Sequence, residues 1–227
     1  MVTAIVLAAG RSARMGGGPN KQFIELLGKP LIAYSLAAFE QCNAIDAVVL
    51  VRRPDYARPA EQLVEQFGFK KVIAFIDGGA ERQNSVWNGL EKCDPRTEIV
   101  AVHDGARPLV TPALIESTIA SARKFGTGIA ATKVVDTIKE TNDDKTVIRT
   151  VDRTKLWAVQ TPQTVKYRLL RDAYAKVFER KLLVTDEAAA VELLGEKVHL
   201  VDTPFLNLKV TMPPDLPVAE ALLRQRP

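Results

Sequence analysis

The sequence predicts an α/β protein in which helices cover both faces of a doubly wound, mainly parallel sheet, and it predicts one domain over residues 1–227. Apolar runs of strand length alternate with stretches of helical periodicity, a pattern typical of parallel sheets covered on both faces. The chain is long enough for one domain with a sizeable core. Its 47% hydrophobic and 26% charged residues are the proportions of an ordinary globular protein.

The expected strands follow the continuous apolar runs, which are Ala4–Ala8, Ala47–Val51, Lys71–Ile76, Ile99–His103, Gly128–Val134 and Val198–Val201. The expected helices lie between and after them, at Leu31–Gln41, Ala57–Phe67, Gln83–Glu91, Ala113–Lys124, Lys166–Glu179 and Glu187–Leu194. Pro30 and Pro112 occupy first-turn positions, and Thr111 has the side chain of an N-cap.

One polar stretch breaks the alternation and predicts a protruding β-hairpin arm over about residues 136–155. Two short alternating segments flank the polar turn Asn142–Lys145, as in a hairpin. Because an isolated hairpin is marginally stable in water, we expect the arm to pack on a second subunit, in a homodimer.

Charge and apolar content exclude two classes of partner. The net charge of +4 and the pI of about 9.1 are mildly basic, and aromatic residues are too few among the cations to predict a nucleic-acid interface. No apolar stretch reaches the length of a membrane span, and because the N-terminal residues read as a strand we expect no signal peptide. Cys42 and Cys93 have no metal-ligand spacing, so we expect reduced thiols in a cytoplasmic protein.

The loop after the first strand, residues 10–21, reads GRSARMGGGPNK and contains four glycines, three cations and no acid. In doubly wound sheets, ligands bind beyond the carboxyl ends of the strands. The loop is not a Walker A motif, because Lys21 is followed by Gln22. It is not a dinucleotide fingerprint, because Ser12 occupies the position of the second glycine. We therefore expect a nucleoside-triphosphate loop of a third kind.

Two further segments follow strands. In His103-Asp104-Gly105-Ala106-Arg107-Pro108, Asp104 is either an oxygen ligand for a divalent cation near a triphosphate or a turn residue that caps its own backbone. His103 is expected to be packed, and Arg107 to tie the loop down. The glycines Gly78 and Gly79 can expose backbone groups to a base, and the Ser85 hydroxyl either reaches the base or caps the next helix.

Later residues have ordinary interpretations when each is taken alone. Thr185, beside Asp186 and Glu187, is expected at a helix start, and Lys209 is expected to be a surface charge. No serine–histidine–acid arrangement or carboxylate pair is evident. A phosphate monoester that acts as nucleophile arrives as an anion and needs no general base, so cations, a metal and in-line positioning would suffice.

Several segments occur in one order and at spacings that resemble a known enzyme family: LAAGRSARM with NKQF, GGAERQNSV, HDGARP, VDRTKLWAVQTPQ, TDEAAAVE and NLKVT. Together they resemble the 2-C-methyl-D-erythritol 4-phosphate cytidylyltransferase family of the non-mevalonate isoprenoid pathway, over Ile5 to Ala219. The resemblance implies a Rossmann-like nucleotidyltransferase that transfers CMP from CTP to 2-C-methyl-D-erythritol 4-phosphate. The products would be 4-diphosphocytidyl-2-C-methyl-D-erythritol and pyrophosphate. It also implies Mg²⁺ or another divalent cation.

The resemblance assigns roles residue by residue. It implies catalytic cations at Arg14, Lys21, Arg153 and Lys209. It implies a nucleotide pocket at Ala8, Ala9, Gly10, Gly79, Ala80 and Ser85. It implies that the sugar-alcohol phosphate meets Asp104, Thr137, Arg153, Thr161, Thr185 and Lys209. It also places Asp104 near the metal. Thr137 and Arg153 would lie on the arm that reaches the partner subunit's site.

Two positions depart from some family members, Leu7 in place of proline and Ala80 in place of aspartate. Ala80 leaves only its backbone for contact with the base. No fused second enzyme domain is expected after the final helix. Two alternative functions stay open: a ribitol-5-phosphate cytidylyltransferase, which differs only in the acceptor, and a non-catalytic nucleotide-binding regulator. Arg14, Lys21, Asp104 and Lys209 occur together, which argues against the regulator.

Overall fold

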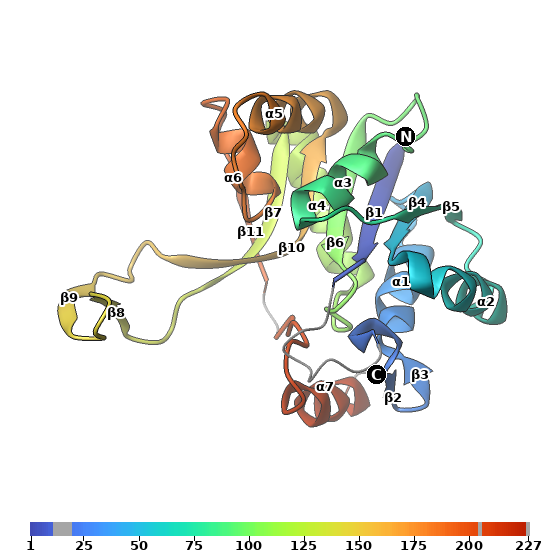
Figure 1. Ribbon diagram of the computed structural model, residues 1–227, viewed down its shortest axis with the longest axis horizontal. Coiled ribbons are helices and arrows are strands. Elements are labelled where there is room, and N and C mark those ends of the chain that lie inside the picture. The colour runs from blue at the N-terminus through green and yellow to red at the C-terminus, as the bar shows by residue number, and fades with distance from the viewer. Residues whose placement is uncertain (11–19, 204–205, 226–227) are drawn as a thin grey trace.

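The structure, a computed structural model, describes residues 1–10, 20–203 and 206–225, and the Arg14 prediction therefore lies outside the described residues. In this part of the chain a seven-stranded sheet has the order β11-β7-β10-β6-β1-β4-β5 (Figure 1). Its strands are β1 (Val2–Ala8), β4 (Ala47–Arg52), β5 (Val72–Asp77), β6 (Ile99–Asp104), β7 (Thr127–Lys133), β10 (Trp157–Lys166) and β11 (Leu200–Asp202). Only β10 of this sheet runs antiparallel to its neighbours, so the prediction of a mainly parallel sheet is confirmed.

Helices cover both faces of the sheet, as expected of a doubly wound fold. One apolar cluster joins the sheet to α1 (Leu31–Gln41), α2 (Ala57–Phe67) and α4 (Pro112–Phe125). A second cluster joins the opposite face to α3 (Arg82–Leu90), α5 (Tyr167–Glu179) and α6 (Glu187–Glu192). Strand side chains alternate between the two clusters, because successive Cβ atoms point to opposite faces. On β1, Val6 belongs to the first cluster and Leu7 to the second.

The helix ends confirm some capping predictions and correct others. Thr111 caps α4 by accepting from the amide of Leu114 at 3.2 Å. The N-cap of α3 is Glu81, so the interpretation of Ser85 as the cap is wrong. Ser85 lies a full turn inside the helix, too late to accept from the first amides. Similarly, α6 is capped by Asp186, whose carboxylate accepts from Ala189, and Thr185 lies outside the helix start.

The strand β10 was not predicted, although it lies between β6 and β7. Its buried inner half carries the polar residues Thr161, Gln163 and Thr164, which do not form an apolar run. Most of their side-chain hydrogen bonds are made to residues distant in sequence; the Thr164 hydroxyl, for example, lies 2.9 Å from that of Thr118. Sequence periodicity cannot reveal a strand whose polar residues are satisfied only in the folded protein.

The predicted hairpin is present. Strands β8 (Ile138–Thr141) and β9 (Val147–Val151) pair antiparallel, and the Asn142 side chain accepts from the amide of Thr146 across the turn. β7 leads into the arm and β10 leads out of it, and the arm extends away from the rest of the chain (Figure 1). Every residue from 139 to 150 is exposed in the single chain.

Small elements complete the described chain. Short segments precede or follow the first helices: η2 (Lys21–Phe23), β2 (Glu25–Leu26), β3 (Lys29–Pro30) and η3 (Pro54–Tyr56). The last helix, α7 (Asp215–Arg224), packs through Ala219 onto a third apolar cluster that includes Leu26, Ala106 and Val210. This cluster fixes the segment before α7 against the loop that follows β6.

No helix among residues 1–10, 20–203 and 206–225 combines the length and the apolar character that crossing a bilayer requires. Of the helices in this part of the chain, α4 is the longest at 14 residues, and it has one buried face.

Candidate active site

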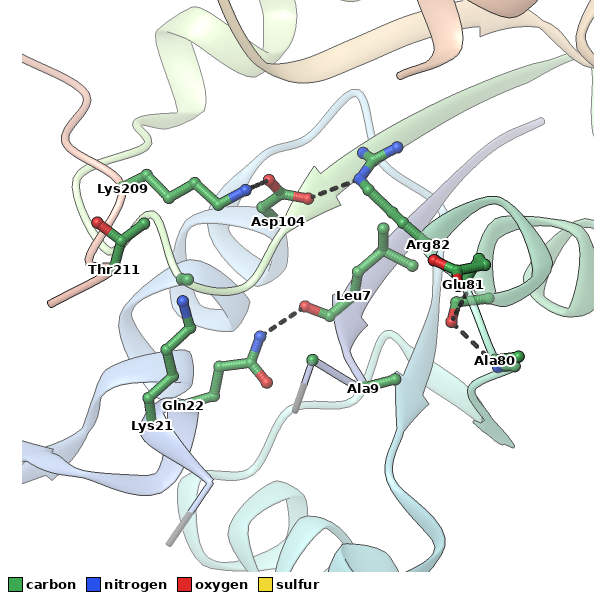
Figure 2. A pocket seen from close by; sticks show the side chains of 14 residues that line it. Leu7, Ala9, Lys21, Gln22, Ala80, Glu81, Arg82, Asp104, Lys209 and Thr211 are labelled. Carbon is green, nitrogen blue, oxygen red and sulfur yellow. Dashed lines mark hydrogen bonds and ion pairs between the residues drawn. The ribbon is translucent and has the colours of Figure 1, made fainter. Parts of the chain in front are cut away.

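A cavity of about 410 Å³ opens beyond the carboxyl ends of β1 and β6. From β1 the chain passes to β4 on one side, whereas β6 lies on the other, so the strand order reverses at this point. Such a switch point leaves a crevice where ligands bind in doubly wound sheets. Fourteen of the residues that the structure describes line the cavity (Figure 2): Leu7, Ala9, Gly10, Lys21, Gln22, Gly79, Ala80, Glu81, Arg82, Ser85, Asp104, Ala106, Lys209 and Thr211.

The loop between β5 and α3 lies close against the end of β1. A Cβ atom at Gly78 would lie 2.2 Å from the Cβ of Ala9, and one at Gly79 would lie 2.3 Å from the Cβ of Asn84. Only glycine permits such an approach. The Ser85 hydroxyl accepts from the amide of Gly79 at 3.1 Å and donates to the carbonyl of Glu81 at 3.3 Å. Ser85 therefore holds this loop at the edge of the cavity.

Lys21 reaches the cavity because the turn that carries it folds back onto β1. The side-chain amide of Gln22 donates to the carbonyl of Leu7 at 2.9 Å, and the side-chain amide of Asn20 donates to the carbonyl of Ala8 at 3.1 Å. Ala8 itself is buried under this turn and does not line the cavity. The Lys21 ammonium donates to the carbonyl of Val210 at 2.9 Å, which places a cation on the far wall.

Asp104 lies at the end of β6 between two cations. Its Oδ2 accepts from Lys209 Nζ at 2.6 Å, and its Oδ1 accepts from Arg82 Nε at 3.3 Å (Figure 2). Burial disfavours the charged carboxylate, but Arg82 and Lys209 outweigh it and hold the pKa of Asp104 well below its usual range. The carboxylate thus faces other side chains, and the interpretation as a self-capping turn residue is wrong. Lys209 is likewise a partner of Asp104 and not an isolated surface charge.

Thr161 supports this strand end from behind. Its hydroxyl accepts from the amide of Asp104 at 3.0 Å and lies 3.1 Å from Nδ1 of His103. Burial lowers the pKa of His103 to about 3, so the imidazole is neutral near pH 7. Thr161 is only 3% exposed and does not line the cavity. In the single chain it fixes the backbone that carries Asp104.

Arg82 and Glu187 form a buried ion pair that the sequence did not reveal. Arg82 donates from Nη1 and Nη2 to the two oxygens of Glu187, at 2.6 and 3.0 Å. Burial opposes the charge of Arg82, but Glu187 and Asp104 more than offset it and raise its pKa. The partners are 105 residues apart, and no local pattern links them.

Arg107 ties down its loop, as expected, by donating to the carbonyl of Asn207 at 2.6 Å. The Asn207 side chain in turn donates to the carbonyl of Thr161 at 2.9 Å. These contacts hold the segment with Lys209 beside the loop that follows β6.

Three other predicted residues lie away from the cavity lining. Arg153 and Thr137 are exposed at the base of the arm, where Nη1 of Arg153 donates to the Thr137 hydroxyl at 3.3 Å. Thr185 is exposed in the loop before α6. A single chain therefore brings Lys21, Asp104 and Lys209 together and leaves the arm residues apart from them.

The acidic side chains at the cavity are few. Asp104 and Glu81 line it, and no cluster of three or more potential metal ligands occurs in the residues that the structure describes. Mg²⁺ is commonly held by one or two carboxylates together with substrate phosphates. The carboxylates present therefore fit a metal that arrives with a polyphosphate better than one held by protein ligands alone.

A profile of one protein family matches residues 2–225, almost the whole chain, and its description is 2-C-methyl-D-erythritol 4-phosphate cytidylyltransferase. The chain belongs to this cytidylyltransferase family. Among curated family members, those of Pelotomaculum thermopropionicum and Geobacillus thermodenitrificans are 43% and 45% identical to it. The alignments cover 99% and 98% of this chain, and 95% and 97% of the relatives.

A solved structure from Anaerococcus prevotii, titled 4-diphosphocytidyl-2C-methyl-D-erythritol synthase, matches with a TM-score of 0.87 and 31% identity. It covers 99% of this chain and 98% of the other. The family likeness expected from the sequence is confirmed over the full length, and the chain is an enzyme of the cytidylyltransferase class.

Proposed function

We propose that this chain transfers CMP from CTP to 2-C-methyl-D-erythritol 4-phosphate, in the synthesis of isoprenoid precursors by the non-mevalonate route. The products are 4-diphosphocytidyl-2-C-methyl-D-erythritol and pyrophosphate. The observation that carries the proposal is the cavity at the switch point, which Lys21, Asp104 and Lys209 line together in a chain of this family. The cations suit a triphosphate and a phosphate monoester that must be brought together.

CTP occupies the side of the cavity formed by β1 and the loop before α3. The backbone of Ala9 and Gly10 lies at one wall, with Ala8 buried behind it, and Gly79, Ala80 and Ser85 lie at the other wall. Because Ala80 has no polar side chain, its main-chain groups contact the base. Lys21 and Arg14 bind the triphosphate.

The reaction is an in-line displacement at the α-phosphorus. An oxygen of the acceptor phosphate forms the new P–O bond, the bond to the bridging oxygen of the β-phosphate breaks, and pyrophosphate leaves with that electron pair. Lys21 stabilises the negative charge that grows on the triphosphate. No proton is removed from the nucleophile, which suits a described cavity lining that contains no histidine.

Asp104 is the residue that would hold Mg²⁺ or a similar divalent cation, together with triphosphate oxygens. The cation would reduce the repulsion between the triphosphate and the anionic acceptor. Lys209 and Arg82 orient the carboxylate from the protein side.

The acceptor binds beside Asp104 and Lys209, near the segments of Thr161 and Thr185, and a second subunit completes its site. Thr137 and Arg153 lie on the exposed arm, so the arm of one protomer supplies them to its partner in a homodimer. The guanidinium of Arg153 would grip the acceptor phosphate with paired hydrogen bonds, and Lys209 would act as a point charge.

We place the reaction in the cytoplasm. Cys42 and Cys93 are free thiols and both are buried. Unpaired cysteines are typical of proteins that fold in a reducing compartment.

The test is pyrophosphate release by the purified chain with CTP and 2-C-methyl-D-erythritol 4-phosphate. ATP, GTP and UTP replace CTP in parallel reactions, and ribitol 5-phosphate replaces the acceptor. We expect release with CTP and the methylerythritol phosphate to exceed every other combination. Faster turnover with ribitol 5-phosphate, or binding of CTP with no release, would overturn the proposal.

A further inference from the structure

Glu187 lies behind the cavity wall, and its side chain is fully buried. Besides the two hydrogen bonds from Arg82, its Oε1 accepts from the hydroxyl of Tyr174 at 3.0 Å. A buried ion pair seldom stabilises a fold more than well-packed apolar residues of the same volume would. The role of the pair therefore follows from how it orients the Arg82 guanidinium and not from a gain in folding stability.

The pair fixes the direction of the third hydrogen-bond donor on Arg82. A guanidinium is planar and rigid, so engagement of Nη1 and Nη2 by Glu187 determines where the Nε–H bond points. Nε donates to Oδ1 of Asp104 at 3.3 Å. On the other side of the same carboxylate, Oδ2 accepts from Lys209 at 2.6 Å (Figure 2). Each contact therefore orients the next, from Glu187 to the ammonium of Lys209.

Lys209 needs such support because its side chain is a flexible four-carbon stem. Its ammonium has three N–H groups, and the contact with Asp104 uses one of them. Among the described residues the ammonium has no second hydrogen-bond partner, so two N–H groups can serve a ligand while the first holds the group in place.

We propose that Glu187 is a positioning residue for the acceptor end of the active site, acting through Arg82 and Asp104 on Lys209. It contacts neither substrate. This inference rests on the proposed function, because it requires that Lys209 bind the acceptor phosphate.

The decisive variant is Glu187→Gln, which keeps the side-chain shape and removes the charge. The glutamine amide presents a single acceptor oxygen, so the paired grip on Arg82 is lost. We expect KM for the acceptor to rise and kcat to fall, with about a tenfold to hundredfold loss of kcat/KM, as is typical when a supporting partner of an active-site group is removed. KM for CTP should stay at the wild-type value.

A purely structural role predicts a different result. If Glu187 only stabilised the fold, Glu187→Gln would lower the fraction of folded enzyme. Apparent kcat would then fall, and the KM values for CTP and for the acceptor would not change. The matched control is Glu192→Gln, the same substitution at an exposed position of α6, for which all three constants should equal those of the wild type.

A double-mutant cycle with Arg82→Gln tests the route of the effect. If Glu187 acts through Arg82, the variant with both substitutions loses no more acceptor kcat/KM than Arg82→Gln alone. The double variant also protects the test against misfolding, because it removes both charges of the buried pair, whereas Glu187→Gln alone leaves the guanidinium without its bidentate partner. Additive losses, or an unchanged acceptor KM in Glu187→Gln, would overturn the inference.

Failure of this inference can be distinguished from failure of the proposed function. A wild-type chain that releases no pyrophosphate from CTP and the acceptor refutes the proposed function. An active wild type in which Lys209→Ala raises the acceptor KM and Glu187→Gln does not refutes the positioning role alone.

Discussion

The ammonium of Lys21 donates to the main-chain carbonyl of Val210 at 2.9 Å, across 189 residues of sequence. The amide of Val210 donates to the carbonyl of Ala106 at 2.8 Å, in the loop after Asp104. Lys209, the residue before Val210, pairs with Asp104. The backbone of Lys209 and Val210 therefore sets the spacing between the two ammonium groups of Lys21 and Lys209.

Lys21→Ala should lower kcat by about a hundredfold or more, because it removes a preorganised cation from a transition state that gains negative charge. The fold should survive, since the Lys21 side chain is only partly buried. Steady-state pyrophosphate release and a thermal melt measure the two effects. Lys29→Ala, at an exposed position of β3, is the control and should retain full activity. A near-wild-type rate in Lys21→Ala would remove Lys21 from the mechanism.

Arg14→Ala should behave like Lys21→Ala, because both cations belong to the same acid-free loop.

Removal of divalent cations should abolish activity, and added Mg²⁺ should restore it. The clustered negative charge of the triphosphate repels the anionic acceptor unless a cation is shared among its oxygens. The measurement is turnover in excess EDTA, followed by titration with MgCl₂. Full activity in the chelator would contradict the role of Asp104 as a metal ligand.

Mixing two inactive variants should restore part of the activity if the arm completes the partner's site. Arg153→Ala removes the group supplied by the arm, and Lys209→Ala removes the group supplied by the home subunit. After subunit exchange, each mixed dimer would contain one intact site. The readout is pyrophosphate release, and exchange is verified with differently tagged chains. Activity that stays at the mutant level after verified exchange, or an active monomer, would show that the sites are not shared.

Neither cysteine should react with a thiol-specific alkylating reagent at pH 8 in the folded protein. Burial raises the pKa of the Cys93 thiol to about 12 and also raises that of Cys42, so the reactive thiolate is scarce and inaccessible. Mass spectrometry should find no adduct in buffer and two adducts in denaturant. Rapid labelling of either residue in buffer would show that its site opens readily.

Because the raised pKa of Cys93 keeps the thiol protonated in the folded protein, the free energy of unfolding should fall as the pH rises above about 9.

Elements with local signals were predicted well. The bounds of α1 and α2 agree with the sequence prediction, since both helices have clear periodicity, and Gly68, with φ of 66°, ends α2. β10 had no such signal, because Thr161 and Gln163 find their partners only in the folded chain.

The candidate site divides in the same way. Lys21, Asp104 and Lys209 were predicted from motifs and from the family resemblance, and the structure brings them to one cavity. Arg82 and Glu187 were missed because a contact over 105 residues leaves no trace in local sequence. The arm residues Thr137 and Arg153 lie apart from the cavity in the single chain, so their part in the site stays a prediction.

The two halves of β10 pair with different strands. The outer half, from Trp157 to Val159, pairs with β7 at the base of the arm, and the inner half, from Gln163 to Lys166, pairs with both β6 and β7. The register shifts between the halves, where Thr161 holds the end of β6. β10 thus joins the central sheet to the base of the arm, whereas β8 and β9 form a two-stranded sheet of their own. A force applied to the arm would therefore reach the backbone beneath the active site through β10, a strand of ten residues.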